Sequence, residues 1–358
     1  MSVYDEAKFK EWTILIYADG NNNLQPYIYN QFQLIKNINK DNINIIVQIS
    51  RKSIDKDVSW CGCRRYLFSE NKIILLKDLG KVNMDESKLL EDFLVESVNT
   101  YPSTNVILVI SGHSAGFIGL MYSENDNAFM GIDEFSKALC LFNNKTNRYI
   151  DVLIMDTCFM DSIETWYDII MKSKSSIRYA IVPQDNAPIE GISYYDMINS
   201  LLMYQNPIIN HQYIKEMMSK QLLECSLFCI NLREDIFKRI RKSINEYAQL
   251  LLLENKKSRD RTLRLCCIDS VNDFIPLYDF NNIDTCNSDV KECIFDIMKI
   301  LGEIIIFNQY NSGQTNRRGL KIYFPHNYEI YNNFRNIYRQ MDFCVNNNWT
   351  LLIDDKYI

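Results

Sequence analysis

Two short apolar runs, each followed closely by a reactive side chain, constrain the fold of this chain most. The first run spans residues 106–110 and leads into His113, and the second spans residues 151–155 and leads into Cys158. Short runs rich in β-branched residues and closed by turn residues are typical of strands buried on both faces. In an open α/β sheet, ligands bind just beyond the carboxyl ends of such strands. The pattern therefore predicts that neighbouring strands deliver a histidine and a cysteine to the same edge of a sheet.

The surrounding sequence predicts an α/β fold. Apolar runs at 12–17, 43–49 and 179–182 predict further strands, and residues 64–69 and 73–76 predict a hairpin or meander. Helical spacing of apolar residues occurs at 24–39, 88–98, 132–142 and 161–172. Strands that alternate with helices in this way indicate a mostly parallel sheet with helices on both faces.

The composition changes after about residue 205. We expect residues 1–205 to form the domain that contains the sheet and residues 206–358 to form a mainly helical part packed on it. Strands are predicted near 263–268 and 320–324, and they could extend the same sheet from the far end of the chain.

Charge and composition exclude several classes of protein. The net charge of -6 gives no electrostatic footprint for nucleic acid or an anionic membrane, and no apolar run approaches the roughly 20 residues of a membrane span. The polar N-terminus lacks a signal-peptide core, which favours a cytoplasmic protein over a secreted mature form. Eleven cysteines, an odd number, suggest free thiols in a reducing compartment. With three histidines and no Cys-x-x-Cys pair, no structural zinc site is expected.

Cys158 and His113 are the candidate reacting groups. Free cysteines are often simply buried core residues, but Cys158 ends a predicted strand and precedes a predicted helix whose N-terminus would favour the thiolate. His113 is surrounded by small residues, so that a substrate backbone could approach closely. A cysteine and a histidine at neighbouring strand ends can act as nucleophile and base. The backbone N–H groups of Ser114 and Cys158 could then hold an oxyanion.

Spacing argues against three other cysteine chemistries. A glutamine amidotransferase or hydrolase elbow needs Gly-x-Cys-x-Gly, whereas residues 156–160 read Asp-Thr-Cys-Phe-Met. A cysteine phosphatase needs an arginine six residues after the cysteine, where this chain has Glu164. The papain signature is absent, and the order of His before Cys is the reverse of that in papain.

The order His then Cys resembles the caspase-like cysteine peptidases, and among them it is most similar to the clostripain family (peptidase family C11). The resemblance rests on an ordered set of motifs that spans most of the chain, at 12–17, 19–24, 79–84, 101–102, the His113 loop, 131–134, 156–160 with Glu164, and 318–325. One departure is Ser114, at a position where the family usually has glycine.

The resemblance implies a caspase-like fold and a cysteine endopeptidase that forms a thioester through the dyad of His113 and Cys158. It also implies peptide or protein substrates cleaved after Arg or Lys, because an acidic side chain in the first specificity pocket pairs with the cation. The family places this acid in the loop after the strand that follows the cysteine, where we favour Asp185 over Glu190. Asp156 is expected either to charge the same pocket or to cap the following helix.

Relatives often cut themselves between the histidine and the cysteine, so Lys145 or Arg148, in the polar segment 143–148, is the predicted self-cleavage point; a plain surface connection is the alternative. No cofactor is required by the dyad. Some relatives depend on calcium, and segments 123–127 and 281–284 could supply oxygen ligands, although neither follows a known binding-loop pattern.

Two other functions fit the same residues. The chain could be a peptidase-like protein that has lost turnover and acts as a binding or regulatory subunit, which Ser114 and the absence of a visible secretion signal would favour. It could also be an acyl transferase or amidase that uses the same dyad on a small substrate.

Overall fold

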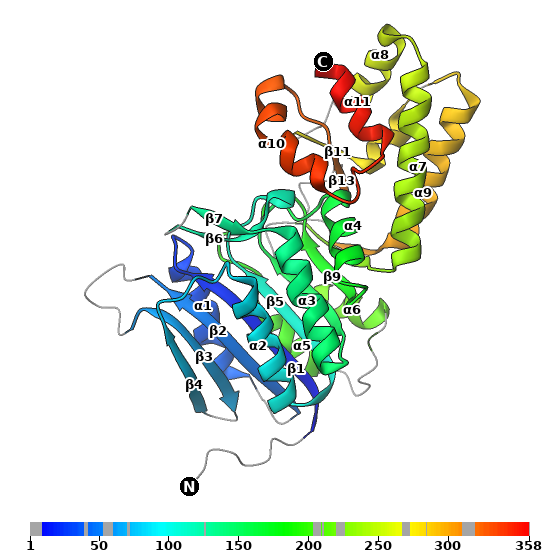
Figure 1. Ribbon diagram of the computed structural model, residues 1–358. Helices are drawn as coiled ribbons and strands as arrows, with labels where there is room; N and C mark the ends of the chain where they lie inside the picture. Colours follow the sequence, from blue (N-terminus) through cyan, green and yellow to red (C-terminus); the bar gives the residue numbers. More distant parts are fainter. Residues whose placement is uncertain are drawn as a thin grey trace.

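A nine-stranded sheet runs through the protein in the order β12-β10-β9-β8-β5-β1-β2-β3-β4 (Figure 1). The computed structural model describes residues 9–38, 42–52, 60–69, 72–124, 127–202, 209, 211–219, 226–266, 273–283, 285–309 and 319–357. The strands of this sheet are β1 (Lys10–Gly20), β2 (Ile43–Arg51), β3 (Gly62–Ser69), β4 (Lys72–Gly80), β5 (Ser103–Ser111), β8 (Ile150–Asp156), β9 (Ile177–Pro183), β10 (Leu227–Asn231) and β12 (Ile305–Gln309). The strands from β9 to β2 are parallel, and those at both edges are antiparallel.

Helices cover both faces of the sheet, because its central strands are apolar on both sides. In β1, Leu15 and Tyr17 pack into one core, and Ile14 and Ile16 pack into the other. The first core is covered by α2 (Ser87–Thr100), α3 (Ile132–Thr146) and α4 (Ile163–Lys172), and the second by α1 (Gln25–Leu34), α5 (Tyr194–Leu202) and α6 (His211–Ser219). This arrangement confirms the predicted α/β class.

The C-terminal part gathers at one end of the sheet (Figure 1). Its helices are α7 (Glu234–Leu253), α8 (Lys256–Cys266), α9 (Ser288–Ile304), α10 (Tyr328–Gln340) and α11 (Asn348–Tyr357). Two short strands, β11 (Phe274–Pro276) and β13 (Lys321–Tyr323), form a separate small sheet, as do β6 (Leu120–Ser123) and β7 (Ala128–Met130). Short 3-10 helices lie at Ile35–Asn37, Gly116–Ile118 and Leu277–Asn282.

The C-terminal part differs from the prediction in two ways. The strand predicted at 263–268 is wrong, because residues 263–266 belong to α8 and residues 267–268 lie outside the described part. The strand predicted near 320–324 is β13, but it pairs with β11 and does not extend the main sheet. That extension comes from β10 and β12, so the sheet continues past the predicted boundary at residue 205.

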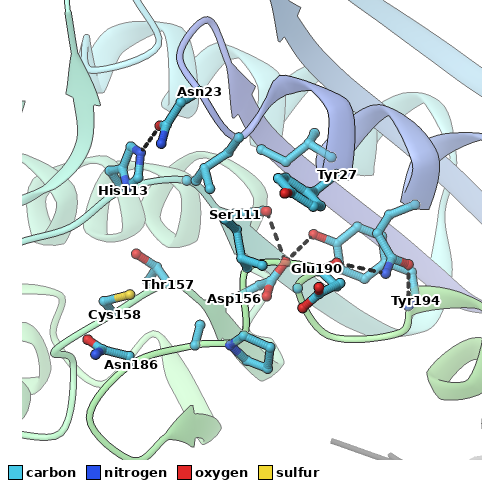
Figure 2. A pocket seen from close by; sticks show the side chains of 18 residues that line it. Asn23, Tyr27, Ser111, His113, Asp156, Thr157, Cys158, Asn186, Glu190 and Tyr194 are labelled. Atoms are coloured by element: carbon cyan, nitrogen blue, oxygen red, sulfur yellow. Dashed lines mark hydrogen bonds between the residues drawn. The ribbon is translucent and has the colours of Figure 1, made fainter. Parts of the chain in front are cut away.

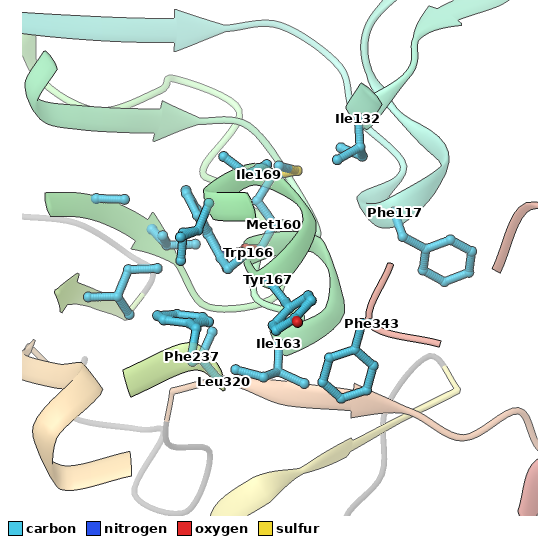
Figure 3. Close-up of a cluster of buried hydrophobic side chains, with 14 of the residues drawn as sticks. Phe117, Ile132, Met160, Ile163, Trp166, Tyr167, Ile169, Phe237, Leu320 and Phe343 are labelled. Atoms are coloured by element: carbon cyan, nitrogen blue, oxygen red, sulfur yellow. Dashed lines mark hydrogen bonds between the residues drawn. The ribbon is translucent and has the colours of Figure 1, made fainter. Parts of the chain in front are cut away.

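Helix α4 joins the sheet to the C-terminal part. Ile163 and Trp166 are fully buried, and the surrounding apolar cluster includes Phe237 of α7, Leu320 and Phe343 (Figure 3). The indole N–H of Trp166 donates to the carbonyl of Met160 over 2.6 Å. The loop between β8 and α4 is therefore tied directly to this core. Among the described residues, no helix has the length and apolar character needed to cross a membrane.

Candidate active site

The register between two central strands brings His113 and Cys158 to the same edge of the sheet. Ser111, the last residue of β5, pairs in parallel with Asp156, the last residue of β8. His113 and Cys158 each follow two residues later. Both line a cavity of about 270 Å³ at the carboxyl ends of the strands, and His113 and Cys158 lie on one side of it (Figure 2). The structure thus brings the two predicted reacting groups to one site.

The imidazole of His113 is held by the loop between β1 and α1. Its Nε2 lies 2.6 Å from Oδ1 of Asn23, so the amide oxygen accepts the Nε2–H hydrogen bond and Nδ1 carries the lone pair. The loop is itself fixed by Asp19, which accepts from the backbone N–H of Asn21 over 3.0 Å. Burial lowers the pKa of His113, and the charge of Glu124 offsets this only in part. The ring is therefore neutral near pH 7 and suited to accept a proton.

The thiol of Cys158 is half-buried and protonated near neutral pH. Burial raises its pKa, and Asp156 and Asp161 add to this effect, while a hydrogen bond from the backbone N–H of Ala187 opposes it. The sequence predicted that a helix N-terminus just after Cys158 would stabilise the thiolate. Helix α4 instead begins at Ile163, with Ser162 as its N-cap, so its first turn does not directly follow the thiol. Cys158 consequently needs a base to remove its proton, which is the role open to His113.

Ser114 ties the two reactive loops together. Its hydroxyl donates to the carbonyl oxygen of Cys158 and accepts from Oγ1 of Thr157 over 2.6 Å. Ser114 is not among the residues that line the cavity, so its side chain does not narrow the approach to the thiol. That the backbone N–H groups of Ser114 and Cys158 hold an oxyanion stays a prediction.

Asp156 lies on the side of the cavity away from His113 and Cys158 (Figure 2). Its Oδ2 accepts from the hydroxyl of Tyr194 over 2.6 Å and from that of Ser111 over 2.9 Å. Its Oδ1 accepts from the backbone N–H of Ile192 over 2.8 Å. Burial raises the pKa of Asp156, and these three donors act in the opposite direction. The carboxylate is thus held in one orientation by fixed donors, which fits a binding role better than a simple helix cap.

The structure places Asp185, the predicted base of the specificity pocket, outside the cavity that His113 and Cys158 line. Asp185 is not among the lining residues, and its carboxylate forms an ion pair with Lys321. Glu190, which the sequence suggested was an ordinary loop charge, does line the cavity. The difference between the two acids follows from their places in one loop. Residues 186–191 line the cavity, whereas Asp185 lies one residue before them and its side chain reaches the C-terminal part.

Three residues that line the cavity were not predicted from the sequence. Asn23 belongs to the motif at 19–24, and its place at the end of a parallel strand was the available signal. No sequence motif indicated that Tyr194 or Gly191 would lie in the site. Gly191 has φ +76, and a Cβ there would lie 2.8 Å from Oδ2 of Asp156, so that only glycine leaves room for the carboxylate.

The predicted self-cleavage points lie in different environments. Lys145 is in the last turn of α3 and forms an ion pair with Glu91. Arg148 lies in the short connection between α3 and β8, and its guanidinium donates to the carbonyl of Thr104 over 2.9 Å. A peptidase binds its substrate in extended form, so Arg148 is the better placed of the two, and self-cleavage there stays a prediction.

Of the two segments considered for calcium, 123–127 and 281–284, each includes positions outside the described residues (125–126 and 284). In the part of the chain that the structure describes, no group of three or more His, Cys, Asp or Glu side chains could hold a metal ion. Calcium dependence stays a prediction.

Comparison with known proteins places the chain in a family. The clostripain family model matches residues 16–355. Clostripain of Hathewaya histolytica is 23% identical over 192 residues, which cover 46% of this chain and 36% of clostripain. The alignment thus spans about a third of the length of that relative.

Three solved structures share the fold at low sequence identity. A secreted C11 cysteine protease from Bacteroides thetaiotaomicron bound to an irreversible peptide inhibitor has a TM-score of 0.64 at 15% identity and covers 97% of this chain and 99% of its own. An inactive zymogen C11 protease from Parabacteroides distasonis has a TM-score of 0.65 at 15% identity, with coverages of 94% and 97%. A further secreted C11 protease from Bacteroides thetaiotaomicron, iotapain, has a TM-score of 0.70 at 14% identity, with coverages of 94% and 99%. Since the family model matches nearly the whole chain, this protein belongs to the clostripain family, peptidase family C11.

Proposed function

We propose that this protein is a cysteine endopeptidase that cleaves after lysine or arginine. The observation that carries the proposal is one cavity that His113 and Cys158 line on one side and Asp156 and Glu190 on the other. Neither lysine nor arginine is among the lining residues. A substrate side chain that enters beside the thiol would thus meet negative charge.

The cavity walls suit a long side chain with a charged tip. Leu24, Tyr27, Pro188 and Ile189 supply apolar surface to the cavity. Lysine and arginine carry apolar stems that pack on such surface while the cationic head reaches a polar partner. A carboxylate is the natural partner for an ammonium or guanidinium group. Asp156 is the better candidate than Asp185, because Asp156 lines the cavity and Asp185 does not.

The proposed reaction uses the dyad in two stages. Nδ1 of His113 takes the thiol proton as Sγ of Cys158 attacks the carbonyl carbon of the scissile bond. The resulting oxyanion would be held by the backbone N–H groups of Ser114 and Cys158. His113 then gives its proton to the amine as the C–N bond breaks, which leaves a thioester on Cys158. Water, deprotonated by His113, attacks the thioester, and the carboxylic acid product and the free thiol are released.

Every group in these steps belongs to the chain, so the proposal includes no resident cofactor. The test is hydrolysis of fluorogenic peptides that differ only in the residue before the cleaved bond: Lys, Arg, Asp or Leu. We expect the wild type to cleave the Lys and Arg peptides and Cys158→Ala to cleave none. Wild-type cleavage restricted to Asp or Leu would reject the acidic pocket but keep the dyad. No cleavage of any peptide would favour the catalytically silent binding protein instead.

A further inference from the structure

A buried lysine from the C-terminal part lies between two carboxylates next to the active site. Lys321 is 3% exposed and Asp161 is 4% exposed. Nζ of Lys321 lies 3.0 Å from Oδ2 of Asp161 and forms a second ion pair with Oδ1 of Asp185. The two carboxylates raise the pKa of Lys321 although burial acts to lower it. One ammonium thus neutralises much of the charge of two acids, of which Asp161 is buried and Asp185 is half-buried.

The cluster joins three segments that are far apart in sequence. Asp161 follows Cys158 by three residues, and Asp185 directly precedes the loop 186–191 that lines the cavity. Lys321 begins β13. Backbone hydrogen bonds reinforce the junction: the N–H of Lys321 donates to the carbonyl of Asp161 over 2.8 Å, and the N–H of Asp185 donates to Oδ2 of Asp161 over 3.0 Å.

Two residues of this junction have strained backbones. Phe159, the residue after the nucleophile, has φ +57, and Asp185 has φ +63. The N–H of Phe159 donates to the carbonyl of Asp185 over 2.7 Å. Residues other than glycine are uncommon in this left-handed region and stay there only when their surroundings hold them. The surroundings here are the ion pairs and hydrogen bonds of Lys321 and Asp161.

We propose that Lys321 is a positioning residue of the active site, which holds the Cys158 loop and the cavity loop in their working arrangement. The proposal rests on the proposed function, because the loop that Lys321 holds carries the nucleophile. It also gives the C-terminal part a defined task. The contact between β13 and α4 supports this task, since Oε1 of Glu164 accepts from the backbone N–H of Tyr323 over 2.7 Å.

The first test is Asp185→Asn, assayed on Lys, Arg and Leu peptides. This variant leaves one ammonium facing one carboxylate, so the protein is expected to stay folded. A positioning role predicts that kcat falls about tenfold for the Lys and Arg peptides, with KM and the preference for Lys over Leu unchanged. Unchanged kcat would overturn the proposal. Loss of the preference alone would also overturn it, because Asp185 would then be the specificity residue.

The second test does not depend on peptide cleavage. The rate at which iodoacetamide alkylates Cys158 is followed against pH by mass spectrometry for the wild type and Lys321→Met. Loss of the cation beside Asp161 and displacement of the loop from the N–H of Ala187 should both raise the thiol pKa. We expect the midpoint to move upward by half a pH unit or more.

The control is Lys172→Met, because Lys172 also pairs with several acids, Asp133, Asp168 and Asp342, but at the far end of α4. It should leave the midpoint unchanged. Equal midpoints in all three proteins, or equal shifts in both variants, would overturn the proposal. If Lys321→Met does not fold, Asp185→Asn decides it. An absence of peptidase activity in the wild type would reject the proposed function, while the alkylation data would still decide the role of Lys321.

Discussion

The side-chain oxygen of Asn23 lies 2.6 Å from Nε2 of His113, which makes Nε2 the donor nitrogen and leaves the lone pair on Nδ1. A base that is oriented by a third group is a recurring arrangement in nucleophilic catalysis. Here the third group comes from the loop after β1, the strand that neighbours the histidine strand. Residues that follow three adjacent strands, β1, β5 and β8, thus contribute to one site.

Removal of this contact should slow catalysis without weakening substrate binding. Asn23→Ala loses one hydrogen bond worth about 1 kcal/mol, so kcat should fall about fivefold while KM stays constant. The measurement is steady-state kinetics on a Lys peptide. Asn21→Ala is the matched control, because it keeps the backbone N–H that donates to Asp19, and it should retain wild-type kcat. A rise in KM alone for Asn23→Ala would contradict the orienting role.

The pH dependence of kcat/KM should reflect the lowered pKa of His113. Burial lowers this pKa from the ordinary 6.5, so the acid limb of the profile should have its midpoint below pH 6.5. Asn23→Asp places a negative charge beside the ring and should move that midpoint upward by about one pH unit or more. Identical acid limbs in the two proteins would show that the limb does not report His113.

Asp156 should select the cationic substrate side chain. Asp156→Asn keeps the shape of the side chain but removes its charge, and the loss of a buried charge pair costs about 2 kcal/mol or more. We expect kcat/KM for Lys and Arg peptides to fall at least about 30-fold, with little change for a Leu peptide. Glu190→Gln is the control, because Glu190 is exposed and should matter less. A larger loss in Glu190→Gln would assign selection to Glu190.

Gly191 should be required for the position of the Asp156 carboxylate. In Gly191→Ala the new Cβ would meet Oδ2 of Asp156 at 2.8 Å, and φ +76 would strain the backbone. The predicted result is a loss of Lys and Arg cleavage comparable to that in Asp156→Asn. In Gly302→Ala in α9, no atom outside the helix's own backbone lies within 4 Å of the new Cβ, so this variant should keep activity and stabilise the helix by up to about 1 kcal/mol. Wild-type cleavage by Gly191→Ala would show that the cavity loop moves freely.

Glu164 should make stability depend on pH. Burial raises the pKa of this carboxyl from 4.5 to about 7, so the folded protein binds a proton that the unfolded chain releases. Its contribution is fully present below pH 4.5 and is lost as the pH rises to 7. The upper limit is about 3 kcal/mol. Urea unfolding at pH 4.5 and pH 7 should therefore show a smaller decrease in unfolding free energy for Glu164→Gln than for the wild type. Equal decreases would contradict the raised pKa.

The sequence predicted the parts of the site that lie at strand ends. Runs 106–110 and 151–155 are apolar on both faces, and parallel strands of this kind expose their following residues at one edge. This local rule placed His113 and Cys158 in the same cavity. The same rule, applied to the motif at 19–24, would have included Asn23.

Contacts between distant segments were not predictable in this way. Whether Asp185 faces the cavity or turns away depends on Lys321, 136 residues later, and no local pattern reports that approach. The strands β10 and β12 are short and lie among helices, so their sequences resemble buried helical segments. Their place at the sheet edge follows from packing of the whole chain.

The most direct test is covalent labelling with a single peptide probe. The probe ends in a lysine whose carbonyl end carries a reactive acyloxymethyl ketone group. Digestion and mass spectrometry then locate the adduct among the eleven cysteines. We expect one adduct, on Cys158, which is absent in His113→Ala and strongly reduced when leucine replaces lysine in the probe. Labelling of another cysteine, or equal labelling by both probes, would contradict the proposed nucleophile or the proposed acidic pocket, respectively.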